Sequence, residues 1–181
     1  MPSFLRTLIC AAVLLCTAGA QAALRVGDAA PGFTTAAAVA GKTFDFDLTA
    51  ALRQGPVVLY FFPKAFTQGC TLEAHAFAEA TPRFAALGAK VVGMSHDDIA
   101  TLQRFSTEAC RDQFAVASDP QARTIRAYDA AAAANPQRAD RISYVIGQDG
   151  RIAFVHMGAD PLAHVQQTEA AVLRLRPGAK Q

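Results

Sequence analysis

Residues 56–70 read PVVLYFFPKAFTQGC, an apolar strand that runs into a turn and then into a helix. The strand, residues 56–62, is uniformly apolar, as expected when both faces of a strand are buried, and Pro63 cannot continue it. Residues 71–87 have the pattern of an amphipathic helix, so Cys70 falls where that helix begins. There, unpaired backbone N–H groups and the positive end of the helix dipole favour thiolate over thiol. The sequence therefore predicts that Cys70 is a nucleophile.

The rest of the chain alternates between strands and helices. We expect strands at residues 42–48, 90–95, 114–117, 142–146 and 152–156, and helices at residues 71–87, 97–110, 119–128 and 161–175. The pair Asp149-Gly150 predicts a hairpin between the last two strands. Asp97 and Asp160 are the expected N-caps of their helices, and the alanine-rich residues 130–134 should form a helix end or a surface loop. This order of elements predicts an α/β, thioredoxin-like fold, with a central mixed sheet flanked by helices.

The first 22 residues have the pattern of a secretory signal peptide. Arg6 supplies the charge, residues 8–18 the apolar core, and residues 20–22 a small-residue cleavage site. The apolar core is much shorter than the ~20 residues that span a membrane, although an uncleaved signal anchor remains the alternative. We expect an exported protein, periplasmic or secreted, without stable membrane association. Residues 23–181 should form a single domain.

The charge and the cysteine content of the chain argue against several kinds of function. The net charge is +2 with no basic run, which argues against a nucleic-acid partner. Removing the signal removes Cys10 and Cys16 and leaves Cys70 and Cys110, which are expected to pair in an oxidising compartment. No Cys-x-x-Cys and no histidine pair with metal-ligand spacing is present, so we expect neither a metal nor a cofactor.

Three segments resemble the peroxiredoxin family. Pro63-x-x-x-Thr67-x-x-Cys70 is similar to its active-site pattern, and residues 26–33 (VGDAAPGF) and 141–146 (RISYVI) are similar to its opening segment and to a later strand. Within the family, residues 60–74 look most like the peroxiredoxin Q, or bacterioferritin comigratory protein, branch. The resemblance covers residues 24–176. It implies a thioredoxin-like fold with the peroxiredoxin N-terminal extension, a thiol-dependent peroxidase activity and a monomer.

The resemblance implies a role for each residue of the pattern. Cys70 is the peroxidatic cysteine, which attacks one oxygen of a peroxide and becomes a sulfenic acid. The Thr67 hydroxyl holds the peroxide, and the Arg141 guanidinium favours the thiolate and stabilises the charge that develops in the transition state. Pro63 shapes the turn and screens the sulfenic acid from water. Glu73 either tethers Arg141 or is solvated, Thr67 could also cap the helix, and Arg141 could instead pair with a surface carboxylate.

The second cysteine has two interpretations. His75 stands where many members of the branch carry the resolving cysteine, whereas other members carry it in the helix where Cys110 lies. The resemblance therefore implies that Cys110 resolves the sulfenic acid as an intramolecular disulfide, which a thioredoxin-like or other dithiol reductant then reduces. The alternative is an exported thioredoxin-fold binding or chaperone module in which Cys70–Cys110 is a structural disulfide. Such a module would need neither Thr67 nor Arg141.

The sequence assigns no function to the remaining histidines. His75 is expected to be a surface or packing residue, and His96 follows a strand at the edge of the sheet, where a supporting role is open. His156 and His164 have no constellation of functional residues around them in the sequence.

Overall fold

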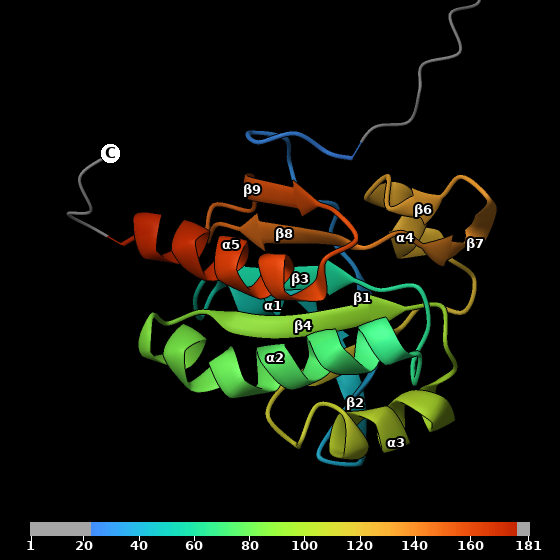
Figure 1. Ribbon diagram of the computed structural model, residues 1–181. Coiled ribbons are helices and arrows are strands. Elements are labelled where there is room, and N and C mark those ends of the chain that lie inside the picture. The colour runs from blue at the N-terminus through green and yellow to red at the C-terminus, as the bar shows by residue number, and fades with distance from the viewer. Residues whose placement is uncertain (1–22, 177–181) are drawn as a thin grey trace, which may run out of the picture.

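A seven-stranded mixed sheet forms the centre of this computed structural model, which describes residues 23–176 (Figure 1). Its order is β2-β1-β5-β4-β3-β8-β9, and β3–β4 and β4–β5 are the parallel pairs. The strands are β1 Thr34–Val39, β2 Lys42–Asp47, β3 Val57–Phe61, β4 Lys90–Ser95, β5 Ala115–Ser118, β8 Ile142–Ile146 and β9 Ile152–Met157. The expected mixed sheet is confirmed. The predicted signal peptide, residues 1–22, lies outside the described residues.

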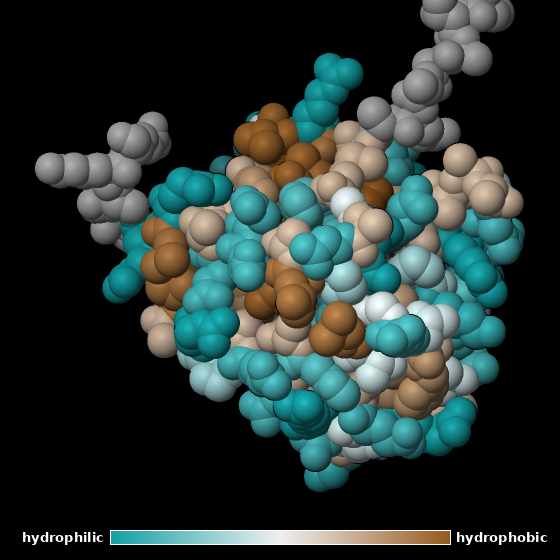
Figure 2. All heavy atoms as spheres, viewed as in Figure 1, coloured by the Kyte–Doolittle hydropathy of each residue, from teal (hydrophilic) through white to brown (hydrophobic). Residues whose placement is uncertain are grey.

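Helices cover both faces of the sheet. One hydrophobic cluster packs the first face against three helices, α2 Gln68–Ala86, α3 Ile99–Glu108 and α5 Pro161–Arg174, which lie in front of the sheet in Figure 1. A second cluster packs the other face against the short helices α1 Leu48–Leu52 and α4 Arg123–Ala127. On the face that Figure 2 shows, polar residues cover most of the surface and apolar residues form separate small patches. Within residues 23–176, no helix combines the length and apolarity that a membrane crossing requires.

The central strand β3 explains the uniformly apolar run in the sequence. All five of its residues are buried, because β4 and β8 flank it and helices cover both of its faces. Alternate side chains enter opposite cores, so Val58 and Tyr60 pack with α2 and α3, whereas Leu59 and Phe61 pack on the other face.

The predicted ends of α2 and α5 agree closely with the structure. α2 begins at Gln68, three residues earlier than expected, and Gly88 follows its C-cap with a positive φ of 75°. Asp160 caps α5 by accepting a hydrogen bond from the Leu162 amide. The hairpin of β8 and β9 is antiparallel, as the Asp149-Gly150 pair predicts.

Three local expectations were wrong. α3 is capped by Asp98, and Asp97 instead accepts hydrogen bonds from the Ala65 amide and the Ser95 hydroxyl. The predicted helix over residues 119–128 shortens to α4, because the Asp119 carboxylate accepts the Arg123 and Ile125 amides. The alanine-rich segment pairs as a small hairpin of β6 Ala131–Ala132 and β7 Asn135–Ala139.

Strand β1 and the short helix α1 were missed altogether. β1 reads TTAAAV, and it lacks the large apolar residues by which a strand is recognised in sequence. It is held by pairing on both sides, with β2 and with β5. β1 therefore depends on its neighbours rather than on its own composition.

Candidate active site

Cys70 lies in the first turn of α2, directly after the turn that follows β3. Its side chain is 2% exposed, and Thr67 occupies the N-cap position. The turn is anchored by the Ala65 amide, which donates to the Asp97 carboxylate over 2.7 Å. Phe66 in the same turn has a positive φ of 64°. The sequence did not indicate this role of Asp97, which ties the cysteine-bearing turn to the end of β4.

Arg141 reaches Cys70 across the sheet. β8 runs antiparallel to β3 and Ile142 pairs with Phe61, so the residue before β8 lies at the edge of the sheet where α2 begins. The Arg141 Nη2 atom lies 3.6 Å from the Cys70 Sγ atom. Gly69 leaves room for this contact, since a Cβ atom there would lie 3.2 Å from Nη2. The structure thus brings together two side chains that the sequence separates by 71 positions.

Glu73 holds the other side of the same guanidinium. It lies one turn further along α2, is fully buried, and forms an ion pair and hydrogen bond with Arg141 Nη1. Burial raises the pKa of the Glu73 carboxyl group, and the Arg141 charge opposes that rise. Of the two interpretations of Glu73, the structure supports the tether, and Arg141 pairs here rather than with a surface carboxylate.

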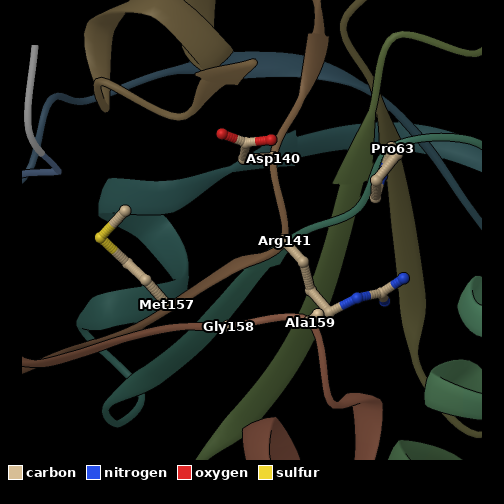
Figure 3. A pocket seen from close by; sticks show the side chains of 6 residues that line it. All are labelled: Pro63, Asp140, Arg141, Met157, Gly158 and Ala159. Atoms are coloured by element: carbon tan, nitrogen blue, oxygen red, sulfur yellow. The ribbon is translucent and has the colours of Figure 1, made fainter. Parts of the chain in front are cut away.

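Thr67 and Pro63 lie in the turn before Cys70. The Thr67 hydroxyl donates to the Lys64 carbonyl over 3.0 Å and makes no side-chain cap bond to α2. Pro63 borders a hollow of about 420 Å³ that is lined by Pro63, Asp140, Arg141, Met157, Gly158 and Ala159 (Figure 3). In Figure 3 the Arg141 side chain points away from Asp140 and Met157. The hollow therefore lies beside the Cys70 contact and shares Arg141 with it.

Cys110 lies just beyond α3 rather than inside it, which corrects the expected helix end at residue 110. Ala109 is the C-cap, and the chain turns through Arg111 and Asp112, whose φ values are 51° and 62°. Cys110 is fully buried in the same hydrophobic cluster as Cys70, and both thiols are free. Burial raises the pKa of the Cys110 thiol well above its ordinary value, and the Asp112 charge adds to the rise.

Tyr60 is a buried group near both thiols that the sequence did not single out. Its ring stacks on Phe77 with centroids 4.4 Å apart, and it fills the space opposite Gly93, where a Cβ atom would lie 2.7 Å from the Tyr60 Cζ atom. Its hydroxyl has no hydrogen-bond partner among the described residues. Burial raises the pKa of Tyr60, and the charges of Cys110, Glu73 and Cys70 raise it further.

His164 and His156, which the sequence left without neighbours, meet beside the hollow. His164 is fully buried, with its Nδ1 atom 2.8 Å from the Ser143 hydroxyl and its Nε2 atom 3.0 Å from the Gly158 carbonyl. The two imidazole rings lie edge to face, with centroids 4.5 Å apart. The sequence did not indicate these partners of His164, because Ser143 and Gly158 come from β8 and from the loop after β9. No cluster of three or more metal-ligating side chains occurs in residues 23–176.

The protein has a thioredoxin-like sheet, and the cysteine at the start of α2 contacts an arginine that is paired with a glutamate. These features place it in the class of thioredoxin-fold proteins whose site is built on a thiol. Residues 26–155 match the AhpC/TSA family, and the chain belongs to this family. Chloroplastic peroxiredoxin Q of Populus jackii is 30% identical over 143 residues, 78% of this chain and 65% of that protein. Peroxiredoxin Q of Oryza sativa subsp. japonica is 30% identical over 62% of this chain. The chain thus spans between 52% and 65% of the length of these plant relatives.

Two Mycobacterium tuberculosis proteins match over more of their length. A Mycobacterium tuberculosis protein named as a peroxiredoxin is 31% identical over 147 residues, which cover 78% of this chain and 90% of that protein. The crystal structure of peroxidoxin BcpB from M. tuberculosis superposes with a TM-score of 0.77 at 27% identity and covers 85% of this chain and 99% of that one. M. tuberculosis AhpC, at 21% identity and a TM-score of 0.74, shows the fold alone. The predicted family and branch are confirmed.

Proposed function

We propose that the protein is a thiol-dependent peroxidase in which Cys70 is the peroxidatic cysteine. The observation that carries this proposal is the 3.6 Å contact between Arg141 and the Cys70 sulfur, with the guanidinium braced by the buried carboxylate of Glu73. A cation and a helix N-terminus facing one sulfur favour its thiolate, which is the nucleophilic form. A purely structural cysteine would need neither group.

In the proposed reaction the Cys70 thiolate attacks one oxygen of the peroxide. The O–O bond breaks, its electron pair leaves on the second oxygen, and that oxygen takes a proton to become water or an alcohol. Arg141 and the backbone N–H groups at the start of α2 stabilise the negative charge as it moves. The Thr67 hydroxyl, whose proton is directed at the Lys64 carbonyl, has lone pairs free to accept a hydrogen bond from the peroxide. Cys70 is left as a sulfenic acid, which Pro63 shields from water.

Resolution of the sulfenic acid is proposed to use Cys110. Its thiol attacks the Cys70 sulfur, a disulfide forms, and water leaves with the thiol proton. Both residues are buried and unbonded, so the first turn of α2 and the segment around Cys110 must open locally. The turn at Arg111 and Asp112 supports this step, because two consecutive non-glycine residues with positive φ store strain beside Cys110.

The substrate is hydrogen peroxide or an organic hydroperoxide, and a thioredoxin-like or other dithiol protein returns the disulfide to two thiols. We propose that the protein is exported, periplasmic or secreted, and acts as a monomer. The signal pattern of residues 1–22 and the branch resemblance support these points.

The test is peroxide consumption by the wild-type protein and by Cys70→Ser, with a dithiol reductant. We expect Cys70→Ser to lose turnover while its unfolding transition stays that of a folded protein. Cys110→Ser is the matched control, since it removes the other buried thiol and should still consume one equivalent of peroxide. Turnover that survives in Cys70→Ser would refute the proposal and would favour a structural role for the cysteines.

A further inference from the structure

The proposed mechanism makes no use of His164, although its ring is completely buried beside Arg141. The ring lies on α5 and bridges two separate segments, since Nδ1 faces the Ser143 hydroxyl on β8 and Nε2 faces the Gly158 carbonyl after β9. A buried imidazole with both nitrogens engaged is fixed in one orientation. Both segments adjoin Arg141, since Ser143 follows it by two residues and the Gly158 N–H donates to its carbonyl.

The hydrogen bonds of His164 define its tautomer. A carbonyl oxygen can only accept, so Nε2 carries the proton toward Gly158, and Nδ1 accepts from the Ser143 hydroxyl. Burial lowers the pKa of His164 to about 4, and the charges of His156 and Arg141 act in the same direction, against the Gly158 carbonyl and Asp160. His164 therefore stays neutral at neutral pH and does not repel the guanidinium.

The Gly158 peptide is the link between His164 and Arg141. Its carbonyl accepts from His164, while its N–H donates to the Arg141 carbonyl over 3.5 Å. Ser143 on β8 follows Arg141 by two residues, so the chain of hydrogen bonds returns to the segment that begins with Arg141. Gly158 also lines the hollow that Arg141 borders (Figure 3). The backbone from which Arg141 reaches toward Cys70 is thus held on two sides.

We propose that His164 is a positioning residue that holds the Gly158 peptide against Arg141 and so keeps the guanidinium against Cys70. The inference rests on the proposed function, because the consequence of this positioning is fast oxidation of Cys70. His164 touches neither the peroxide nor the sulfur. Ser143 contributes by fixing the tautomer in which Nε2 can donate to Gly158.

Two substitutions of His164 distinguish the hydrogen bond of Nε2 from that of Nδ1. In His164→Gln the amide nitrogen can occupy the place of Nε2 and donate to Gly158, whereas the shorter amide of His164→Asn reaches only Ser143. Val172→Ala on the same helix is the matched control, since Val172 is 1% exposed and its truncation weakens the packing of α5 without touching the chain of hydrogen bonds. All variants are made in the full chain, and their melting temperatures are recorded.

The first measurement is the rate at which hydrogen peroxide oxidises Cys70 in a single turnover. We expect His164→Asn to slow it about ten-fold, the scale seen when a partner that orients a functional side chain is lost, and His164→Gln to restore most of the rate. Val172→Ala should oxidise at the wild-type rate despite a lower melting temperature. A wild-type rate in His164→Asn, or an equal fall in Val172→Ala, would overturn the inference.

The second measurement does not depend on peroxide. In a Cys110→Ser background, the rate at which iodoacetamide alkylates Cys70 is followed as a function of pH, and the modified residue is identified by peptide mapping. A displaced guanidinium should move the midpoint of this profile to higher pH in His164→Asn but not in Val172→Ala. If the wild type consumed no peroxide while the profile still shifted, the proposed function would fail and the positioning role would stand. An unshifted profile in His164→Asn would overturn the positioning role alone.

Discussion

Arg141 is the residue on which the site depends, because one guanidinium serves both Cys70 and Glu73. Its Nη1 atom binds the Glu73 carboxylate and its Nη2 atom faces the Cys70 sulfur. A planar fork with several N–H groups can satisfy two partners in fixed directions, whereas an ammonium group is a single point charge.

Arg141→Lys should therefore lower the rate of Cys70 oxidation by about 10²-fold, the scale for loss of a donor aimed at developing charge. The Lys variant keeps the positive charge, so this loss would show that geometry matters beyond charge. Arg138→Lys, an exposed arginine on β7, is the control and should leave the rate unchanged. Stopped-flow oxidation with hydrogen peroxide measures both, and equal rates in wild type and Arg141→Lys would contradict the two-partner role.

Substitution of Thr67 should change the rate of Cys70 oxidation without a matching change in the melting temperature. Thr67→Val removes the hydroxyl and should slow Cys70 oxidation by about 10²-fold, while Thr67→Ser keeps it and should stay close to wild type. The Thr67 side chain makes no cap bond to α2, so neither change should lower the melting temperature as loss of an N-cap would. A full rate in Thr67→Val would show that the hydroxyl does not hold the peroxide.

In the proposed mechanism two elements, the start of α2 and the end of α3, change together during turnover. In the reduced protein, Cys70 is 2% exposed within α2 and Cys110 is fully buried after α3. Cys70 has only one helical turn to unwind, and Cys110 already lies outside regular helix. The same opening that brings the sulfurs together exposes Cys110 and so removes the burial that disfavours its thiolate.

Peroxide-treated wild-type protein should accordingly contain an intramolecular Cys70–Cys110 disulfide, found by peptide mapping without reduction. Cys110→Ser should complete the first oxidation and then accumulate sulfenic acid, followed by irreversible over-oxidation at Cys70. Hydrogen exchange should show the amides in the first turn of α2 opening more readily than those around Phe77. Normal cycling of Cys110→Ser with a dithiol, and no such disulfide in the wild type, would mean that an outside thiol resolves Cys70.

The molecule as a whole places its site at the end of the central strand β3, where α2 begins and where Arg141 directly precedes the neighbouring strand β8. The core on the α2 side contains both cysteines, while Arg141 directly precedes β8, which pairs with β3. His164 joins α5 to this arrangement through Ser143. Because the ring is buried and neutral, its protonation is linked to global unfolding.

The sign of that linkage follows from the lowered pKa of His164. The unfolded chain binds a proton at this residue near pH 6.5, while the folded protein resists protonation until about pH 4. Between these values acid favours the unfolded state, so stabilisation by neutral His164 is complete above pH 6.5 and declines as the pH falls toward 4. The full effect over this window is roughly 3 kcal/mol, from about 1.4 kcal/mol per unit of pKa.

Urea unfolding of the wild type and of His164→Gln from pH 7 to pH 4 measures this pH-dependent contribution of His164 to the free energy of unfolding. The stability advantage of the wild type should shrink toward pH 4. At each pH, the free energy of unfolding of His164→Gln is subtracted from that of the wild type, which removes the contributions of groups common to both proteins. One such group is Glu73, whose pKa is raised by burial and whose effect on stability therefore changes with pH in the opposite direction. A difference that stays constant over this range would contradict the lowered pKa.

Much of the fold could be predicted because its signals are local. The buried strand β3, the hairpin at Asp149-Gly150 and the cap at Asp160 each occupy a few consecutive residues. β1 escaped prediction, since its small side chains form a strand only when β2 and β5 pair with it. The shortened α4 has a similar origin, because hydrogen bonds of one buried carboxylate, Asp119, replaced the expected helical turn.

The sequence alone predicted Cys70 as the reactive residue and determined what kind of element presents it, because an apolar strand, a proline and a helix start around Cys70 are encoded within 15 residues. The tertiary structure decided which groups surround that sulfur. Arg141 meets the sulfur, Tyr60 shares its hydrophobic cluster, and His164 joins α5 to Ser143 on β8, because strand pairing and helix packing act between positions far apart in the chain. Local patterns encode elements, whereas the partners of a buried side chain follow from how those elements pack.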